Sequence, residues 1–157
     1  MKIAYVEIDT LLAKYNYCID LNEAMVKKGE NVRLTLNQKA SELEKQKQEF
    51  QTKYQNNAYL SQERAQQEYN RIAKLEQDLQ NLSNKLQSEL MSENEKNSLQ
   101  LRDSINAFLK EYNKTKGYSM IISNTGFDNL LYADSVYNIT REILDGLNAR
   151  YSSPAKK

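Results

Sequence analysis

Hydrophobic residues in the middle of the chain recur every three or four positions, which is the spacing of one face of an α-helix. The first stripe consists of Leu36, Ala40, Leu43, Phe50 and Tyr54. The second consists of Ile72, Leu75, Leu79, Leu82, Leu86 and Leu90. After the polar stretch at 92–97 the pattern resumes with Leu101, Ile105, Phe108 and Tyr112. Because charged and amide residues occupy nearly all other positions, the pattern predicts long helices with narrow coiled-coil seams, and Lys47 interrupts the first seam.

The stretch "QNNAYLSQE" at 55–63 predicts a turn between two such helices. Asn56 and Asn57 favour a helix stop, and Ser61 is a good N-cap for the next helix. We therefore expect a helical hairpin over residues 20–116 with its tip at about 56–61. A continuous coiled-coil rod and a tip within "SENEKN" at 92–97 are the alternatives. The two arms of this hairpin are unequal, and a helical break near 92–97 would reconcile them.

Short apolar runs at the two ends of the chain predict strands. Residues 2–9, "KIAYVEID", place Ile3 and Tyr5 on one face and Ala4, Val6 and Ile8 on the other. Residues 117–134, "GYSMIISNTGFDNLLYAD", predict two strands joined by a turn at 124–126, after a helix that ends at Gly117. The helical hairpin would then be inserted into one small sheet.

Two short helical segments complete the expected fold. "TLLAKYNYCID" predicts one or two turns after the first strand, and "NITREILDGLNARY" predicts a final helix capped by Thr140. Residues 2–19 and 117–151 would form a strand-bearing body, and 152–157 would be a tail. Since three strands and a short helix make a marginal core on their own, we expect this body to oligomerise.

Composition excludes several function classes. The chain has 22 basic and 21 acidic residues and a net charge of +1, so no nucleic-acid partner is expected. It has no histidine and a single cysteine, Cys18, which we expect to be a core thiol rather than a nucleophile. No calcium-loop pattern accompanies the acidic cluster at 92–95. We therefore expect no catalytic site, metal or cofactor. No apolar run is long enough for a membrane span, and we expect no signal peptide before the first strand.

The order strand, Lys/Glu/Gln-rich helices, strands and final helix resembles the Skp/OmpH-like family of periplasmic chaperones. The matching stretches are "KIAYVEIDTLLAKY", "LNQKASELEKQKQEFQ" through "RIAKLEQDLQNLSNKLQSEL", and the ending "GYSMIIS…LLYAD…NIT" with its helix. The resemblance covers residues 2–150. It implies a mainly α fold in which strands of three chains form a β-barrel base and three helical hairpins project from it. It also implies an ATP-independent holdase for unfolded outer-membrane proteins, a periplasmic location and weak contact with membrane surfaces.

Two sets of site residues follow from these expectations. On the distal arm, the apolar residues that contact clients would be Phe50, Tyr54, Tyr59 and Leu60. The trimer interface would contain Ile3, Tyr5, Ile8, Met120, Ile122, Leu131 and Tyr132. Two alternatives stay open. The arm aromatics would pack only in the helix seam, or the protein would be a structural coiled-coil adaptor with one defined partner.

Overall fold

The computed structural model describes residues 1–126 and 130–152. The elements follow in the order β1 (Ile3–Glu7), α1 (Ile8–Lys14), α2 (Asn16–Gln55), α3 (Gln62–Lys116), β2 (Met120–Asn124), the 3-10 helix η1 (Ser135–Tyr137) and α4 (Thr140–Arg150). They form two compact units. The first unit comprises Met1–Met25 and Asn94–Lys157, and the second comprises Val26–Glu93.

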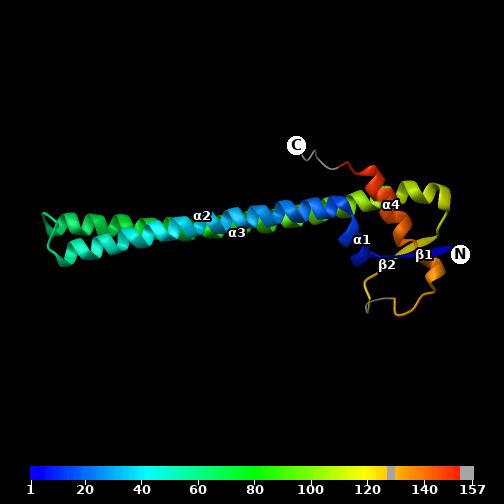
Figure 1. The fold of residues 1–157 in the computed structure, drawn as a ribbon, viewed down its shortest axis with the longest axis horizontal. Coiled ribbons are helices and arrows are strands. Elements are labelled where there is room, and N and C mark those ends of the chain that lie inside the picture. Colours follow the sequence, from blue (N-terminus) through cyan, green and yellow to red (C-terminus); the bar gives the residue numbers. More distant parts are fainter. Residues whose placement is uncertain (127–129, 153–157) are drawn as a thin grey trace. The chain divides into compact units, whose positions relative to one another are not determined.

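The second unit is a helical hairpin, in which α2 and α3 lie side by side (Figure 1). Lys47 pairs with Glu76 at 2.7 Å, and Lys28 pairs with Glu93. Because these partners lie at similar distances in sequence from the connecting residues 56–61, the helices are antiparallel. The helical break considered near 92–97 does not occur, since α3 is continuous from Gln62 to Lys116.

Local chemistry shapes the connection between these helices. The hydroxyl oxygen of Ser61 accepts a hydrogen bond from the Arg64 N–H at 3.1 Å, so the predicted N-cap is confirmed. Asn57 has a φ of 52°, in the left-handed region that asparagine tolerates better than most residues. These two features stop α2 and restart the chain as α3.

The seam of the hairpin is thin. Among its residues only Ala65 and Ile72 are fully buried, at 4% and 6% exposure. The leucines predicted for the seam are half-buried, whereas Ala40 and Tyr54 are exposed, which corrects their assignment to it. Such a seam buries little apolar area per helical turn. The stability of the hairpin therefore comes from many small hydrophobic contacts along its length.

The sheet in the first unit differs from the predicted one. β1 and β2 pair in parallel, from Ile3 opposite Met120 to Glu7 opposite Asn124. The predicted antiparallel hairpin over 117–134 is therefore wrong, and residues 130–133 form no strand. The far edge of β1 is occupied as well, since the Ile139 N–H donates to the Tyr5 carbonyl at 3.0 Å. Pairing with β1 thus replaces the local hairpin. Residue 129 of the predicted strand and the tail from 153 onward lie outside the described residues.

Several predicted boundaries shift. The first strand ends at Glu7, before the predicted end at residue 9, and Ile8 is the first residue of α1. The long helix α2 begins at Asn16 rather than near residue 20. Thr140 is the first residue of α4 instead of its cap, and its hydroxyl accepts a hydrogen bond from the Glu7 N–H at 2.8 Å. The predicted end of α3 at Gly117 is confirmed by the φ of 69° at that glycine.

The core of the first unit lies where α1, α3, α4 and β1 meet. Leu11 of α1 and Ile143 of α4 are fully buried, and Ile105 of α3 is 8% exposed. The other buried members of this cluster are Ala4, Val6, Tyr15, Cys18, Ile139 and Leu147. Residues of α3 beyond the hairpin are thus part of the body, which is larger than the sheet and final helix alone.

Candidate functional site

Four aromatic side chains gather near the loop end of the hairpin. The ring of Phe50 lies at the centre of this aromatic cluster, with its centroid 5.9 Å from that of Tyr54, 5.7 Å from Tyr59 and 6.2 Å from Tyr69. These are distances at which aromatic rings attract one another. The cluster is therefore a contiguous apolar surface rather than a set of isolated rings.

Three different segments contribute to the aromatic cluster. Phe50 and Tyr54 lie four residues apart on α2 and so share one face of that helix. Tyr59 comes from the connecting loop, and Tyr69 comes from the N-terminal part of α3. Tyr54 and Tyr69 remain 50% and 57% exposed, whereas Phe50 and Tyr59 are half-buried. The rings support one another but leave a large part of their surface accessible to a ligand.

A groove of about 630 Å³ runs beside these rings. Its lining residues are Lys47, Phe50, Gln51, Tyr54, Gln55, Tyr69, Ile72, Ala73 and Glu76. The Lys47–Glu76 ion pair crosses between the helices at this groove. On the neighbouring part of the hairpin, Arg71 donates to Gln46 at 2.8 Å and to Glu68 at 2.6 Å. The apolar floor of the groove thus has a rim of paired charges and amides.

The electrostatics of the cluster keep its surface amphipathic. Desolvation by neighbouring side chains, and next the Glu68 carboxylate, raise the pKa of the Tyr59 phenol, so it stays neutral at physiological pH. The hydrogen bond from Arg71 lowers the pKa of Glu68, which stays charged. A neutral tyrosine offers an apolar ring and a hydroxyl that can remain in water. Such a surface suits weak contact with varied apolar side chains.

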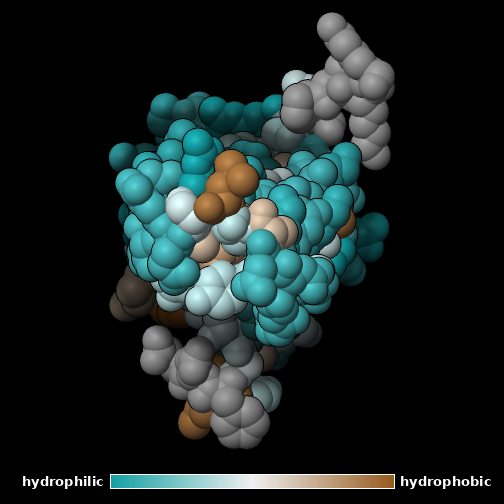
Figure 2. Space-filling model, turned by 90° about the vertical axis from the view of Figure 1, so that its left-hand side faces the viewer, coloured by the Kyte–Doolittle hydropathy of each residue, from teal (hydrophilic) through white to brown (hydrophobic). Residues whose placement is uncertain are grey.

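Three of the four residues predicted for client contact lie in this cluster. Leu60, the fourth, is 90% exposed in the connecting loop. Figure 2 shows the loop end of the hairpin, where hydrophilic residues dominate and hydrophobic ones form a small spot. Tyr69 was not in the predicted client-contact set, although it lies on the arm close to the loop at 56–61.

The residues predicted for the trimer interface belong to the first unit, where their environments differ. Tyr5 is already buried by its own chain, at 7% exposure. Ile3, Ile8 and Ile122 are half-buried. Met120, Leu131 and Tyr132 are exposed at 47%, 79% and 85%. Only part of this set therefore presents a free apolar surface.

Comparison with known proteins identifies the family. The model of the outer membrane protein (OmpH-like) family matches residues 2–147. The chain belongs to the OmpH-like family. A crystal structure of an OmpH-like protein from Caulobacter crescentus CB15, proposed to be an outer membrane chaperone, matches with a TM-score of 0.85 at 12% identity. The match covers 98% of this chain and 88% of the other chain. At 12% identity it shows that the two chains share a fold and nothing more. Among curated proteins none matches.

Other potential chemistry in this OmpH-like chain is sparse. Cys18 is buried, its sulfur accepts a hydrogen bond from the Asn22 amide at 3.7 Å, and burial raises the pKa of the thiol. Across residues 1–126 and 130–152, no group of three or more His, Cys, Asp or Glu side chains is placed to hold a metal ion. Within the same ranges, none of the helices is long and apolar enough to cross a membrane.

Proposed function

We propose that this OmpH-like chain is an ATP-independent holdase chaperone of the periplasm. Its clients are unfolded outer-membrane proteins, which it keeps from aggregating in a cavity between helical arms. The arm is the hairpin of the second unit, and three copies assemble through the first unit. The observation that carries the proposal is the family match over residues 2–147, which includes the strand-bearing ends as well as the helices.

The surface of the arm supports a holding role. An unfolded outer-membrane protein exposes many short apolar segments and has no fixed shape, so a deep specific pocket would serve it poorly. The aromatic cluster instead offers a shallow apolar surface on an otherwise charged hairpin. Weak contacts of this kind on several arms add to a useful avidity, while each contact still dissociates quickly. Release then needs no ATP.

The dimensions of the arm also suit large clients. The 30 residues at 26–55 of α2 form a helix of about 45 Å, at about 1.5 Å per residue. Some of its charged residues form ion pairs, as in Lys47–Glu76 and Arg33–Glu30. This mixed-charge wall keeps the arm soluble and favours neither an acidic nor a basic client. We propose at most weak contact with membrane surfaces, and no nucleic-acid partner.

The test measures aggregation of several unrelated unfolded outer-membrane β-barrel proteins by light scattering, with and without the chaperone. Single alanine substitutions at Phe50, Tyr54, Tyr59 or Leu60 should weaken the suppression only slightly. The combined fourfold variant should weaken it strongly while the oligomeric mass stays unchanged. Because Tyr69 completes the cluster, adding Tyr69→Ala should remove most of what remains.

Gln48→Ala provides the matched control, since Gln48 is exposed on the same helix and does not line the groove. This variant should suppress aggregation as well as the unsubstituted protein does. If one single substitution abolished the activity, the site would be a localised hot spot. A localised hot spot would favour the alternative function, a coiled-coil adaptor with a defined partner. Suppression of the aggregation of only one client would favour the same alternative.

A further inference from the structure

The groove beside the aromatic cluster has two glutamines along one side. Gln51 and Gln55 line it from α2, and both side chains are exposed. Elsewhere on the hairpin a glutamine bonds to the residue four positions away, as Gln66 donates to Asn70 at 3.0 Å. Gln51 and Gln55 are also four positions apart, but neither makes a hydrogen bond among the described residues. Two unused amides therefore lie next to an apolar floor.

The spacing of these two amides matches the backbone of an extended chain. Residues four apart on a helix are separated by about 6 Å along its axis. In an extended chain, residues i and i+2 are separated by about 6.6 Å, and their N–H and C=O groups point to the same edge. Because a glutamine amide both donates and accepts, each of the two can pair with one such residue. A helical segment offers no such match, since its N–H and C=O groups bond to one another.

The aromatic floor of the groove suits the side chains of the same extended chain. Alternate side chains of a strand point to one face, so those of residues i and i+2 lie side by side. The ring centroid of Phe50 is 5.9 Å from that of Tyr54 and 6.2 Å from that of Tyr69. This separation is close to the spacing of alternate side chains. Two apolar side chains of an extended segment can therefore lie against different rings while its backbone pairs with the glutamines.

Charge complementarity favours a segment without charged side chains. Lys47 and Glu76 line the groove and form an ion pair with each other at 2.7 Å. A charged side chain in the groove would compete with this pair and lose part of its own hydration. The groove therefore fits a segment in which apolar side chains alternate with uncharged polar ones. Alternation of apolar and polar side chains is the pattern of membrane-spanning β-strands.

We propose that Gln51 and Gln55 bind the backbone of an extended client segment whose alternate apolar side chains lie on the rings of the aromatic cluster. The groove thus selects unpaired β-strand segments by their alternation and not by their exact sequence, because nearly every residue offers the same backbone groups. One surface can then hold many different unfolded β-barrel proteins. The inference rests on the proposed holdase function and names the class of segment that the arm binds.

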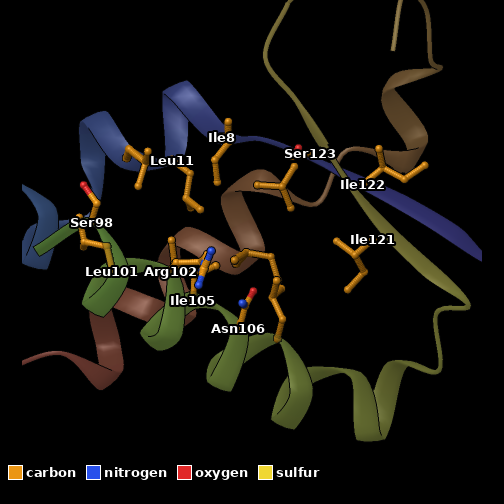
Figure 3. Close-up of a pocket in the computed structure, with 14 residues that line it drawn as sticks. Ile8, Leu11, Ser98, Leu101, Arg102, Ile105, Asn106, Ile121, Ile122 and Ser123 are labelled. Carbon is orange, nitrogen blue, oxygen red and sulfur yellow. The ribbon is translucent and has the colours of Figure 1, made fainter. Parts of the chain in front are cut away.

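A second apolar groove, of about 410 Å³, opens on the first unit and is the competing site for such a segment. Figure 3 shows Leu11 of α1 and Leu101 and Ile105 of α3 among its lining residues. The described residues that line it include no aromatic side chain and no glutamine. Arg102, which also lines it, is exposed and has no ion pair among the described residues. An unpaired guanidinium suits an anionic group better than a neutral segment, so the groove on the hairpin is the better fit.

Peptide binding to the full chain tests the inference. A short fluorescent peptide that alternates leucine or tyrosine with threonine or serine is compared, by anisotropy, with a peptide of the same composition whose apolar residues follow helical spacing. We expect the alternating peptide to bind at least fivefold more tightly. Gln51→Leu combined with Gln55→Leu should weaken its binding at least fivefold, although two leucines add apolar surface to the groove. Gln48→Leu combined with Thr52→Leu is the matched control and should leave binding unchanged, since both positions are exposed on α2 and do not line the groove.

Two backbone-methylated forms of the alternating peptide repeat the test without any substitution in the protein. One form lacks the N–H groups of the apolar residues, and the other lacks those of the polar residues. Because these two sets of N–H groups point to opposite edges of an extended chain, only one form should lose affinity, by at least fivefold. Equal affinity of the two forms would overturn the inference.

Equal or tighter binding of the alternating peptide to the variant with Gln51→Leu and Gln55→Leu would also overturn it, since the contact would then be purely apolar. A photoreactive group in the peptide should label residues within 47–76, and labelling within 98–109 instead would place the segment in the other groove. Each of these outcomes leaves the proposed holdase intact if the unsubstituted protein still suppresses client aggregation. The same holds if the alternating peptide does not bind although whole clients are held. A protein that binds neither the peptide nor whole clients would overturn both the inference and the proposed function.

Discussion

At the scale of single residues, Gly146 on α4 is needed because the ring of Phe108 from α3 lies against its Cα. A Cβ at position 146 would overlap Cζ of Phe108 and lie 2.8 Å from its Cε2. Phe108 packs against the core of the first unit, so its ring cannot move aside freely. This close approach fixes how α4 crosses α3 within that unit.

We therefore expect Gly146→Ala to destabilise the protein. Overpacking costs about 1–3 kcal/mol, and the better helix propensity of alanine offsets about 1 kcal/mol of this. The unfolding midpoint in urea should fall, measured at one fixed protein concentration. Gly29→Ala is the matched control, because Gly29 lies inside α2 and a Cβ added there would have no other atom within 4 Å. It should leave stability unchanged or raise it by up to about 1 kcal/mol. Equal effects of both substitutions would contradict this account.

Substitution of Tyr112 on α3, in contrast to that of Gly146, should not destabilise the protein. Its hydroxyl oxygen is buried and makes no hydrogen bond of good geometry within the described residues. Burial, and next the nearby Glu142 carboxylate, raise the pKa of this phenol above its ordinary value. Tyr112→Phe removes an unsatisfied polar group, so stability at neutral pH should stay the same or increase.

The pH dependence of Tyr112→Phe follows from the direction of that shift. Because the phenol ionises more readily in the unfolded chain, the folded state loses stability as pH rises above the unfolded pKa, and the loss grows until pH passes the folded pKa. Unfolding curves at about pH 8 and about pH 11 should show a larger loss of stability in the unsubstituted protein than in Tyr112→Phe. All other residues are the same in both proteins, so their effects cancel in this comparison. An equal or larger loss in the variant would show that Tyr112 is not the group responsible.

At the scale of elements, the helices and a sheet shared by the two ends of the chain were predictable, whereas the absence of a local hairpin over 117–134 was not. Ser61 and Asn57 act on neighbouring backbone groups, so the chain direction near them can be inferred from a few adjacent residues. The sheet joins β1 and β2 from opposite ends of the chain, as predicted, but apolar runs do not specify whether the strands pair in parallel or in which register. Residues 130–133 have the pattern of a strand but find no partner within the described part of one chain.

In the aromatic cluster, too, some contacts follow from local sequence and others depend on tertiary structure. Phe50 and Tyr54 are four residues apart on one helix, so their proximity follows from helix geometry alone. Tyr69 joins them only through the register of the antiparallel hairpin. That register depends on where the loop lies and on cross-helix contacts such as Lys47–Glu76. The sequence therefore predicted the contact residues on α2 and in the loop but left out Tyr69 on α3.

Lys47 itself leads to a prediction about the hairpin. It occupies a seam position, and its ion pair with Glu76 is largely solvent-exposed, so the pair contributes about 0–1 kcal/mol. Leucine at this position would bury apolar area against the half-buried seam. We expect Lys47→Leu to slow hydrogen exchange in the neighbouring turns of α2 and α3. Lys45→Leu, at an exposed position on the same helix, should produce no such slowing. Faster exchange in Lys47→Leu would show that the ion pair stabilises the hairpin more than the seam does.

At the scale of the whole molecule, the exposed apolar residues of the first unit are concentrated in its C-terminal part. Met120, Leu131, Tyr132, Val136 and Tyr137 are all at least 47% exposed there. Clustered exposure of large apolar side chains marks an interaction surface more often than a free one. This surface therefore fits the proposed self-association of the body, and the aromatic cluster on the hairpin fits the proposed contact with clients.

Leu131→Asp separates assembly from folding, because Leu131 is 79% exposed in the single chain and contributes little to its stability. Placing a charge where the proposed trimer buries a leucine removes about 1.5–3 kcal/mol of apolar burial per contact and adds the cost of desolvating the carboxylate. We expect a monomer by light-scattering mass with an unchanged far-UV circular dichroism spectrum. Ile122→Asp, at a half-buried position, should lose both assembly and part of the folded signal. Val26→Asp, at a 72% exposed position on the hairpin, should remain trimeric. If Leu131→Asp stays a trimer as well, residue 131 lies outside the interface and another surface of the body must hold the copies together.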